Sequence, residues 1–243
     1  MCGAQVASWG QTWGNDGMTG EGLPFSPQIS AYKALEGRHT VHITDRWAQN
    51  RTSNLQTAFF NGVGYLAWES VWCNYNQITE RSGEELRRIR TIYRNLGPNL
   101  LNNYASWNPH VPVSTVPGIF ASEFTSTTNA WTLWTAVNRA GMDIGGGEQV
   151  ALELPCSDAS RFFDIWAGVE ISVQCVDGAA ALPSVLLETA GYGCVLRSDD
   201  GSAPASDFLA EMAGLAASPL SSFDSTWRFL RQNPMVPSLH LGR

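Results

Sequence analysis

The chain is poor in charge, since Asp, Glu, Lys and Arg together make up 15% of its 243 residues, well below the usual quarter. Its 22 acidic residues outnumber the 15 basic ones, and the formal net charge is −7. Because a nucleic-acid partner requires a basic stripe and none occurs, no such partner is expected. Hydrophobic residues make up 44%, which excludes disorder of the whole chain.

Long apolar runs and several well-known motifs are also missing. No stretch of about 18 apolar residues occurs, so neither a transmembrane helix nor a membrane partner is predicted. The segment Met1–Gly10 has no basic and no apolar region, and it predicts no signal peptide. The triplet Gly145-Gly146-Gly147 lacks the strand-to-helix context of a phosphate loop and predicts a hairpin turn. No cofactor is expected.

The five cysteines are scattered without a Cys-x-x-Cys pair, so no zinc site and no other metal site is predicted. Their odd number and their strand-like surroundings favour reduced, partly buried thiols. A bridge between Cys156 and Cys175, or between Cys175 and Cys194, stays open for an oxidising compartment.

Strand and helix patterns alternate in the first half of the chain. His39–Asp45 is an alternating, β-branched run, and Gly64–Trp68 is a second short apolar run. Helix patterns occupy 51–60 and 79–96, and a shorter one covers 29–37. This order predicts the strand–helix rhythm of a parallel sheet.

The helix over 79–96 has the strongest pattern. Ser82 and Glu85 have the spacing of a capping box. The charged residues of this helix predict a salt-bridged face, formed by Glu80, Glu84 and Glu85 with Arg81, Arg87 and Arg88.

The pattern changes near Pro112, after which short strands recur with Gly, Asp or Pro between them. Such spacing predicts an antiparallel β-sandwich over 113–197. Its expected core comprises Ile119, Leu133, Val137, Leu152, Leu154, Ile171, Val173, Leu186 and Val195. The spacing of Phe208, Met212 and Leu215 predicts a further helix, which ends before Pro219.

Several strings keep a characteristic order along the chain: Phe59–Trp72, Asn76–Thr79, Leu133–Arg139, Phe163–Gly168 and Glu188–Gly193. Over about residues 30–230 they resemble the glycoside-hydrolase-like part of large proteins that also carry a formylglycine-generating-enzyme-like (sulfatase-modifying factor) domain. In those proteins a (β/α)8 barrel is followed by a β-sandwich. A full barrel takes about 250 residues and about 80 precede the sandwich here, so we expect a fragment of a larger enzyme.

The resemblance implies an α+β chain with a partial (β/α) barrel segment followed by an antiparallel β-sandwich and a C-terminal helix. The expected divisions are an irregular segment over 1–28, the barrel segment over 29–111, the sandwich over 112–198, and the C-terminal helix with a loose tail over 199–243. Incomplete barrels leave open strand edges, which predict self-association of the isolated chain.

Candidate catalytic residues follow the two parallel strands. Glu69 comes directly after the second apolar run and Asp45 ends the first strand, where barrel enzymes place catalytic groups. Two carboxyl groups at one rim are the requirement of glycoside hydrolysis. The structural alternative is that Asp45 caps the next helix or pairs with Arg46, and that Glu69 pairs with an Arg.

Aromatic residues beside these carboxylates suit a carbohydrate, because C–H groups of a sugar ring pack on indole faces. Trp68 and Trp72 flank Glu69, and Trp47 follows Asp45. His42 is the further substrate-contacting candidate. It lies an odd number of residues from His39, so the two histidines do not share a metal.

The sequence therefore favours a glycosidase-like (O-glycosyl hydrolase) fragment that acts on or contacts a carbohydrate through a carboxylate pair. The alternative is a non-catalytic carbohydrate-binding or interaction module, since most active-site loops of a barrel are lacking.

Overall fold

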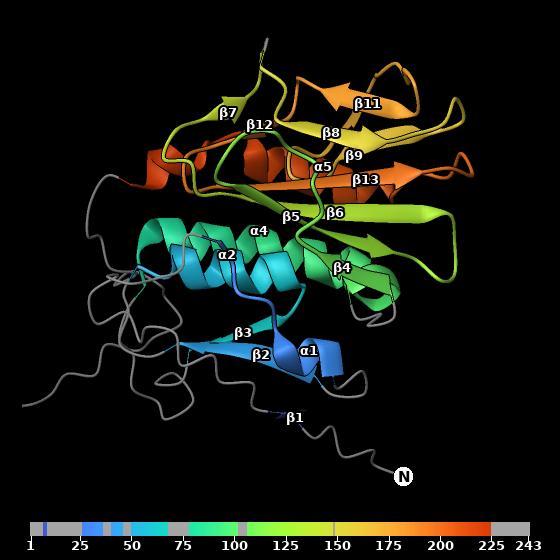
Figure 1. Cartoon of the computed structure of the whole chain (residues 1–243). Coiled ribbons are helices and arrows are strands. Elements are labelled where there is room, and N and C mark those ends of the chain that lie inside the picture. Colours follow the sequence, from blue (N-terminus) through green and yellow to red (C-terminus); the bar gives the residue numbers. More distant parts are fainter. Residues whose placement is uncertain are drawn as a thin grey trace, which may run out of the picture.

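The computed structural model describes residues 7–8, 26–35, 40–45, 50–67, 78–101, 106–147 and 149–224, and they form an α+β protein (Figure 1). A large antiparallel sheet lies at the centre. Helices cover one face of this sheet, and two small sheets cover the other (Figure 1). A parallel sheet lies on the far side of the helices (Figure 1).

The central sheet has six strands in the order β10-β9-β13-β6-β5-β4, each antiparallel to its neighbours. They are β4 (Trp107–Pro109), β5 (Ile119–Thr125), β6 (Trp131–Asn138), β9 (Arg161–Asp164), β10 (Val169–Ile171) and β13 (Tyr192–Ser198). Alternation along β6 sends Leu133 and Val137 to the helix side and Trp134 to the small-sheet side. Both faces of the sheet are therefore buried, which explains the nearly continuous burial of β6.

The small sheets pair β8 (Leu152–Pro155) with β11 (Ala179–Leu182), and β7 (Ile144–Gly145) with β12 (Leu186–Leu187). Their inner side chains and Trp134 form one core cluster. The predicted antiparallel strands of this region are present, although no pattern predicted β4, β7 or β11.

Six of the nine predicted core residues are buried: Ile119, Leu133, Val137, Leu152, Leu154 and Val195. Ile171 and Val173 are half-buried. Leu186 is exposed and is a wrong prediction, because alternation in β12 turns its neighbour Leu187 inward instead.

Three helices cover the other face: α2 (Thr52–Asn61), α4 (Glu80–Leu96) and α5 (Ser206–Ala216). Phe59 of α2, Ile92 of α4 and Met212 of α5 belong to the same core cluster as Leu133 and Leu196 of the sheet. The helices and the sheet thus share one hydrophobic core. The π-helical turn Gly97–Leu101 and the 3-10 helix Leu220–Phe223 complete this side.

The parallel sheet contains β1 (Ala7–Ser8), β2 (Thr40–Asp45) and β3 (Gly64–Ala67) in that order. Ile43 and Tyr65 pack with Ala58 of α2, so one face of this sheet rests on the helix layer. The short helix α1 (Ala31–Leu35) precedes β2. The strands and helices predicted over 29–96 are therefore present with small shifts of their ends.

Two local predictions were wrong. Helix α4 begins one turn before the predicted capping box, because the side chain of Thr79 is the cap and accepts a hydrogen bond from the Ser82 backbone N–H. The cysteines are not all reduced, since Cys156 and Cys175 form a disulfide while Cys194 is a buried free thiol. Loop folding brings Cys156 and Cys175 together, with Cα atoms 5.9 Å apart.

In the part of the chain that the structure describes, no helix has the length and apolar character needed to cross a membrane.

Candidate functional site

Strands β2 and β3 end side by side at one end of the parallel sheet, which we call the β2–β3 edge: the end formed by Asp45 of β2 and Ala67 of β3. These two residues are register partners, as are His42 and Gly64. Because the strands are parallel, both run out of the sheet in the same direction at this edge. Glu69 follows Ala67 by two residues.

Several predicted site residues lie outside the described residues, namely Trp47, Trp68, Glu69 and Trp72. Asp45 and His42 are placed through the backbone of β2. The roles of Glu69 and Asp45 as a carboxylate pair, and of His42 and the three tryptophans as sugar contacts, therefore stay predictions.

Described side chains join the starts of α2 and α4 to each other and to strand β3. Arg51, directly before α2, is buried with 3% exposure, and its backbone N–H donates to Ser82 Oγ at 3.0 Å. Its guanidinium donates to the Tyr65 hydroxyl at 3.0 Å. These two bonds fix the start of α2 to the start of α4 and to strand β3.

Glu85 forms the charged centre beneath these helix starts. Its carboxylate accepts from Thr52 Oγ1, 3.0 Å from either oxygen, and from Arg81 Nε at 2.9 Å. The side chain of Glu85 is fully buried, and this burial raises its pKa from 4.5 to about 7 against the opposing effects of Arg81, Thr52 and Tyr192. The carboxyl therefore changes protonation near neutral pH.

Arg81 links this centre to distant parts of the chain. It donates to both carboxylate oxygens of Asp224 at 2.9 Å and to the carbonyl oxygen of Thr189 at 2.6 Å. The fork geometry of arginine allows one side chain to hold three acceptors. Glu85 and Arg81 thus act as positioning residues for the two helix starts at the β2–β3 edge.

The predicted salt-bridged face of α4 is present for Glu84 and Glu85 with the three arginines, and part of it is buried. Glu84 pairs with Arg87 and Arg88, and Glu84, Glu85 and Arg88 are buried. Arg88 also donates to the Ser218 carbonyl at 2.6 Å. The sequence contained a signal for the burial of Glu85, because this residue lies one turn before Ile89 on the apolar stripe of the helix.

Two further polar residues, His110 and Asp164, have structural contacts away from this edge. The His110 ring lies 4.6 Å from Phe60 near the end of α2, and its Nε2 is 3.0 Å from the Pro27 carbonyl oxygen. Burial raises the pKa of Asp164 to about 6, and its carboxylate accepts from the Ala167 backbone N–H in a turn. Neither group is at the β2–β3 edge.

Within the described ranges, no group of three His, Cys, Asp or Glu side chains is arranged to hold a metal ion.

No family model matches this chain, and no curated protein matches it. Among solved structures, it is similar to the crystal structure of an Anoxybacillus alpha-amylase, which is described as providing insights into a new glycosyl hydrolase subclass. The TM-score is 0.43 and the sequence identity is 9%, over 69% of this chain and 40% of that chain. The chain thus spans less than half of that enzyme, and a likeness of this size carries no conclusion about function.

Proposed function

We propose that the β2–β3 edge carries a glycosidase-type site, in which Glu69 and Asp45 supply the two carboxyl groups. The observation that carries the proposal is the parallel register of Asp45 with Ala67, from which Glu69 is two residues away. Glycoside hydrolysis needs a carboxylic acid that protonates the leaving oxygen and a carboxylate that acts as nucleophile or base. The two strands that lead to these residue types end side by side at this edge.

The substrate in this proposal is a carbohydrate held by aromatic side chains. Trp47 follows Asp45, while Trp68 and Trp72 flank Glu69, so indole faces are available on both sides of the pair. His42 is the proposed polar contact on β2.

The architecture of the first half supports this proposal. Parallel strands β2 and β3 alternate with α2 and α4, which is the repeating unit of a (β/α)8 barrel. We therefore propose that 29–111 is a partial barrel segment, that 112–198 is the sandwich, and that the chain corresponds to part of a larger glycosidase-like protein.

The buried network below the edge has a defined part in the proposed mechanism. Arg51, Thr52 and Glu85 join the starts of α2 and α4. In sequence, α2 follows Asp45 and α4 follows Glu69, so the network fixes the helix to which each proposed carboxylate leads. Precise placement of reacting groups accounts for much of an enzyme's rate enhancement.

The test is cleavage of a panel of aryl glycosides by the purified chain. We expect slow cleavage, because a partial barrel lacks most substrate-binding loops. Glu69→Gln and Asp45→Asn should each lower the rate at least about 100-fold, the usual contribution of an acid–base group. Added azide should restore part of the rate to whichever variant has lost a nucleophile.

Glu153→Gln is the matched control, since Glu153 is an exposed carboxylate on β8. It should leave the rate unchanged, and thermal unfolding should show that all variants fold. Near-normal rates in Glu69→Gln, or no cleavage of any glycoside in the panel, would contradict the catalytic role. Sugar binding without cleavage would favour the non-catalytic module.

A further inference from the structure

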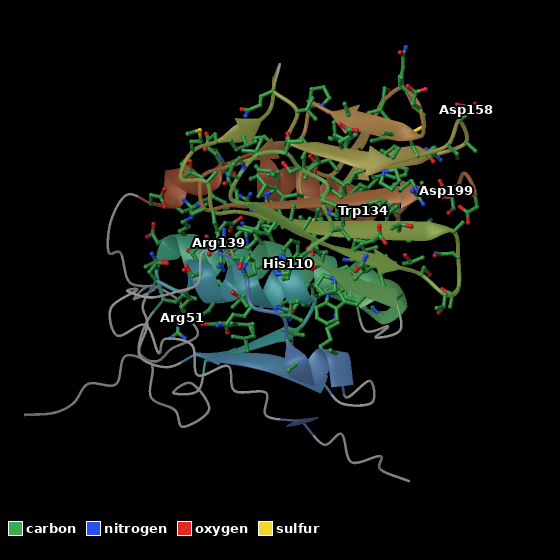
Figure 2. The ribbon with its side chains drawn as sticks, in the orientation of Figure 1. Arg51, His110, Trp134, Arg139, Asp158 and Asp199 are labelled. Carbon is green, nitrogen blue, oxygen red and sulfur yellow. A yellow bond between two sulfur atoms is a disulfide. The ribbon has the colours of Figure 1, made fainter. Side chains whose placement is uncertain are left out.

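A cavity of about 310 Å3 opens in the sheet region, at the opposite end of the molecule from Arg51 (Figure 2). One wall is the loop between β8 and β9, and the other is the segment 172–176 that precedes β11. This cavity is separate from the β2–β3 edge. Its volume lies at the lower end of the range for small-molecule pockets, which suits a single ring and not a long chain.

The cavity combines a polar mouth with an apolar floor. Ser157, Asp158, Ser160 and Gln174 line it with hydroxyl, carboxylate and amide groups. The half-buried Val173 and the exposed Val176 supply apolar surface, with the buried Phe162 beneath them. A ligand that fits must carry both hydrogen-bonding groups and C–H faces.

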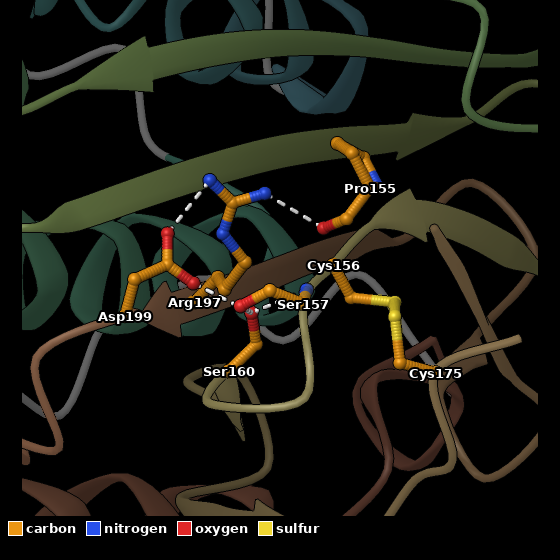
Figure 3. Close-up of a disulfide and its surroundings, with 7 residues drawn as sticks. All are labelled: Pro155, Cys156, Ser157, Ser160, Cys175, Arg197 and Asp199. Carbon is orange, nitrogen blue, oxygen red and sulfur yellow. Dashed lines mark hydrogen bonds and ion pairs between the residues drawn. A yellow bond between two sulfur atoms is a disulfide. The ribbon is translucent and has the colours of Figure 1, made fainter. Parts of the chain in front are cut away.

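The walls are held in place before any ligand arrives. The disulfide Cys156–Cys175 joins one wall to the other (Figure 3). The Ser157 backbone N–H donates to Ser160 Oγ at 2.9 Å, which closes the loop into a tight turn. A preformed site binds more tightly because less conformational entropy is lost.

A second shell of contacts anchors this turn to strand β13. Ser160 Oγ donates to Asp199 Oδ1 at 2.5 Å (Figure 3). Arg197 pairs with Asp199 at 2.9 Å and donates to the Pro155 carbonyl oxygen at 2.7 Å. The Ser160 hydroxyl is therefore oriented by a partner outside the cavity, and the Ser157 hydroxyl lies 3.2 Å from it.

Two of the polar groups have hydrogen-bonding capacity to spare. Within the described part of the chain, neither the Asp158 carboxylate nor the Gln174 amide makes a hydrogen bond that occupies it, and both residues are exposed. Gln174 offers a donor and an acceptor, and Asp158 offers two acceptor oxygens. Together they match neighbouring hydroxyl groups.

The charge and ligand count of the lining exclude other ligand classes. No Lys or Arg lines the cavity, and its one charged side chain is the carboxylate of Asp158, so an anion is disfavoured. With one carboxylate in the lining, a calcium ion, which takes six to eight oxygen ligands and usually several carboxylates, is disfavoured. A neutral polyhydroxylated ring satisfies both the polar mouth and the apolar floor.

We propose that this cavity binds a single neutral sugar residue, as a non-catalytic saccharide site distinct from the β2–β3 edge. The ring's C–H face packs on Val173 and Val176, and its hydroxyls bond to Asp158 and Gln174. Such a site would hold a polysaccharide chain on the protein without taking part in its cleavage.

The test uses saturation-transfer difference NMR on the full chain with methyl glycosides of glucose, galactose, mannose and N-acetylglucosamine. We expect at least one glycoside to bind with a millimolar Kd. Asp158→Asn and Gln174→Ala should each weaken that Kd about tenfold, the effect of losing one hydrogen bond to a polar ligand. The double variant Cys156→Ser, Cys175→Ser should also weaken it, because the walls separate.

Glu153→Gln removes the same charge outside the cavity and should leave the Kd unchanged. Glu69→Gln and Asp45→Asn should also leave it unchanged, so failure of the catalytic proposal and failure of this one are distinguishable. The proposal is overturned if none of the glycosides binds, if Asp158→Asn and Glu153→Gln behave alike, or if binding is lost with the β2–β3 edge variants. Competition by calcium chloride or inorganic phosphate at equal concentration would overturn it as well.

Discussion

The ammonium of Lys33 donates to the carbonyl oxygen of Asn61 at 2.5 Å, which ties helix α1 to the last turn of α2. The same ammonium donates to the carbonyl oxygens of Gly62 and Leu101 at 3.3 and 3.1 Å. It also lies 4.6 Å from the centre of the Phe124 ring. Lys33 is 1% exposed, so this cation is buried among carbonyl and ring partners.

Replacing Lys33 with Met keeps the apolar length of the side chain and removes these donors. We expect the free energy of unfolding at neutral pH to fall by about 2 kcal/mol, because the carbonyl groups lose their partner while the burial of a charge is relieved. Burial lowers the pKa of Lys33 from 10.5 to about 7. Between these pH values the unfolded chain holds a proton that the folded chain has released.

The wild-type stability should therefore rise with pH over this window, relative to the Lys33→Met variant. Urea unfolding of the wild type and of Lys33→Met at pH 7, 8.5 and 10 measures the two pH dependences. Equal pH slopes for the two proteins would show that Lys33 titrates normally. Tyrosine and cysteine titrations occur in both proteins and cancel in the difference.

Glu85 gives the opposite pH dependence. Burial raises its pKa from 4.5 to about 7, so over this range the folded chain keeps a proton that the unfolded chain has lost. The contribution of Glu85 to the free energy of unfolding is complete below pH 4.5 and is lost as the pH rises to 7. Relative to Glu85→Gln, the wild type should lose about 3 kcal/mol of stability over this interval.

Chemical denaturation at pH 4.5, 5.5 and 7 tests this expectation. Asp164, whose pKa is also raised, is present in both proteins and cancels in the comparison. A difference between wild type and Glu85→Gln that stays constant with pH would contradict the raised pKa.

Long periodic segments of the fold could be predicted from the sequence, and short ones could not. Helix α4 and strands β5, β6 and β13 contain enough residues for a period to appear. Strands β4 and β7 have three and two residues, and β11 is Ala-Ala-Ala-Leu, so none shows an alternating pattern. The division of apolar residues between the two faces of β6 also depends on which layers cover them, which no local pattern contains.

The candidate site divides in the same way. The sequence placed Asp45 and Glu69 after two parallel strands, because strand ends are local features, and β2 and β3 are indeed parallel neighbours. The salt-bridged face containing Glu85 and Arg81 was predicted, but the burial of Glu85 was not, because its partner Thr52 and Arg81's partner Asp224 come from distant parts of the chain. The disulfide depends on two loops meeting and was therefore one of two open pairings.

Two glycines with left-handed backbone provide a matched pair of substitutions. Gly62 ends α2 with φ 60°, and a Cβ there would lie 2.8 Å from the Phe124 ring and 2.9 Å from Lys33 Nζ. Gly141 has φ 79°, and a Cβ there would meet none of the described atoms within 4 Å. Both alanine variants carry the backbone strain, and Gly62→Ala adds a steric clash.

We expect Gly141→Ala to lower the unfolding free energy by about 1 kcal/mol and Gly62→Ala by about 3 kcal/mol or more. Thermal and urea unfolding of the two variants measure the difference. Equal losses would mean that Phe124 and Lys33 move aside at little cost, and that the junction of α1, α2 and the sheet is loosely packed.

Because the sheet and the helices share one core, we expect the sheet region to be unstable as an isolated fragment. Leu133, Val137 and Leu196 of the sheet are 0% exposed in the cluster formed with α2 and α4, so the sheet shares this core with the helices. A fragment of residues 106–224 would expose this apolar face, and large exposed apolar patches promote association. We expect the fragment to sediment as dimers or larger species and to unfold with low cooperativity.

Addition of a separate fragment covering residues 26–101 should restore a compact complex, because it returns the helices to that face. The variant Leu133→Asn, Val137→Asn of the 106–224 fragment should associate less, since it makes the exposed face polar. Analytical ultracentrifugation and limited proteolysis follow both effects. A monomeric, protease-resistant 106–224 fragment with one sharp unfolding transition would show that the small-sheet core alone holds the sandwich together, and that α2 and α4 belong energetically to the β2–β3 unit instead.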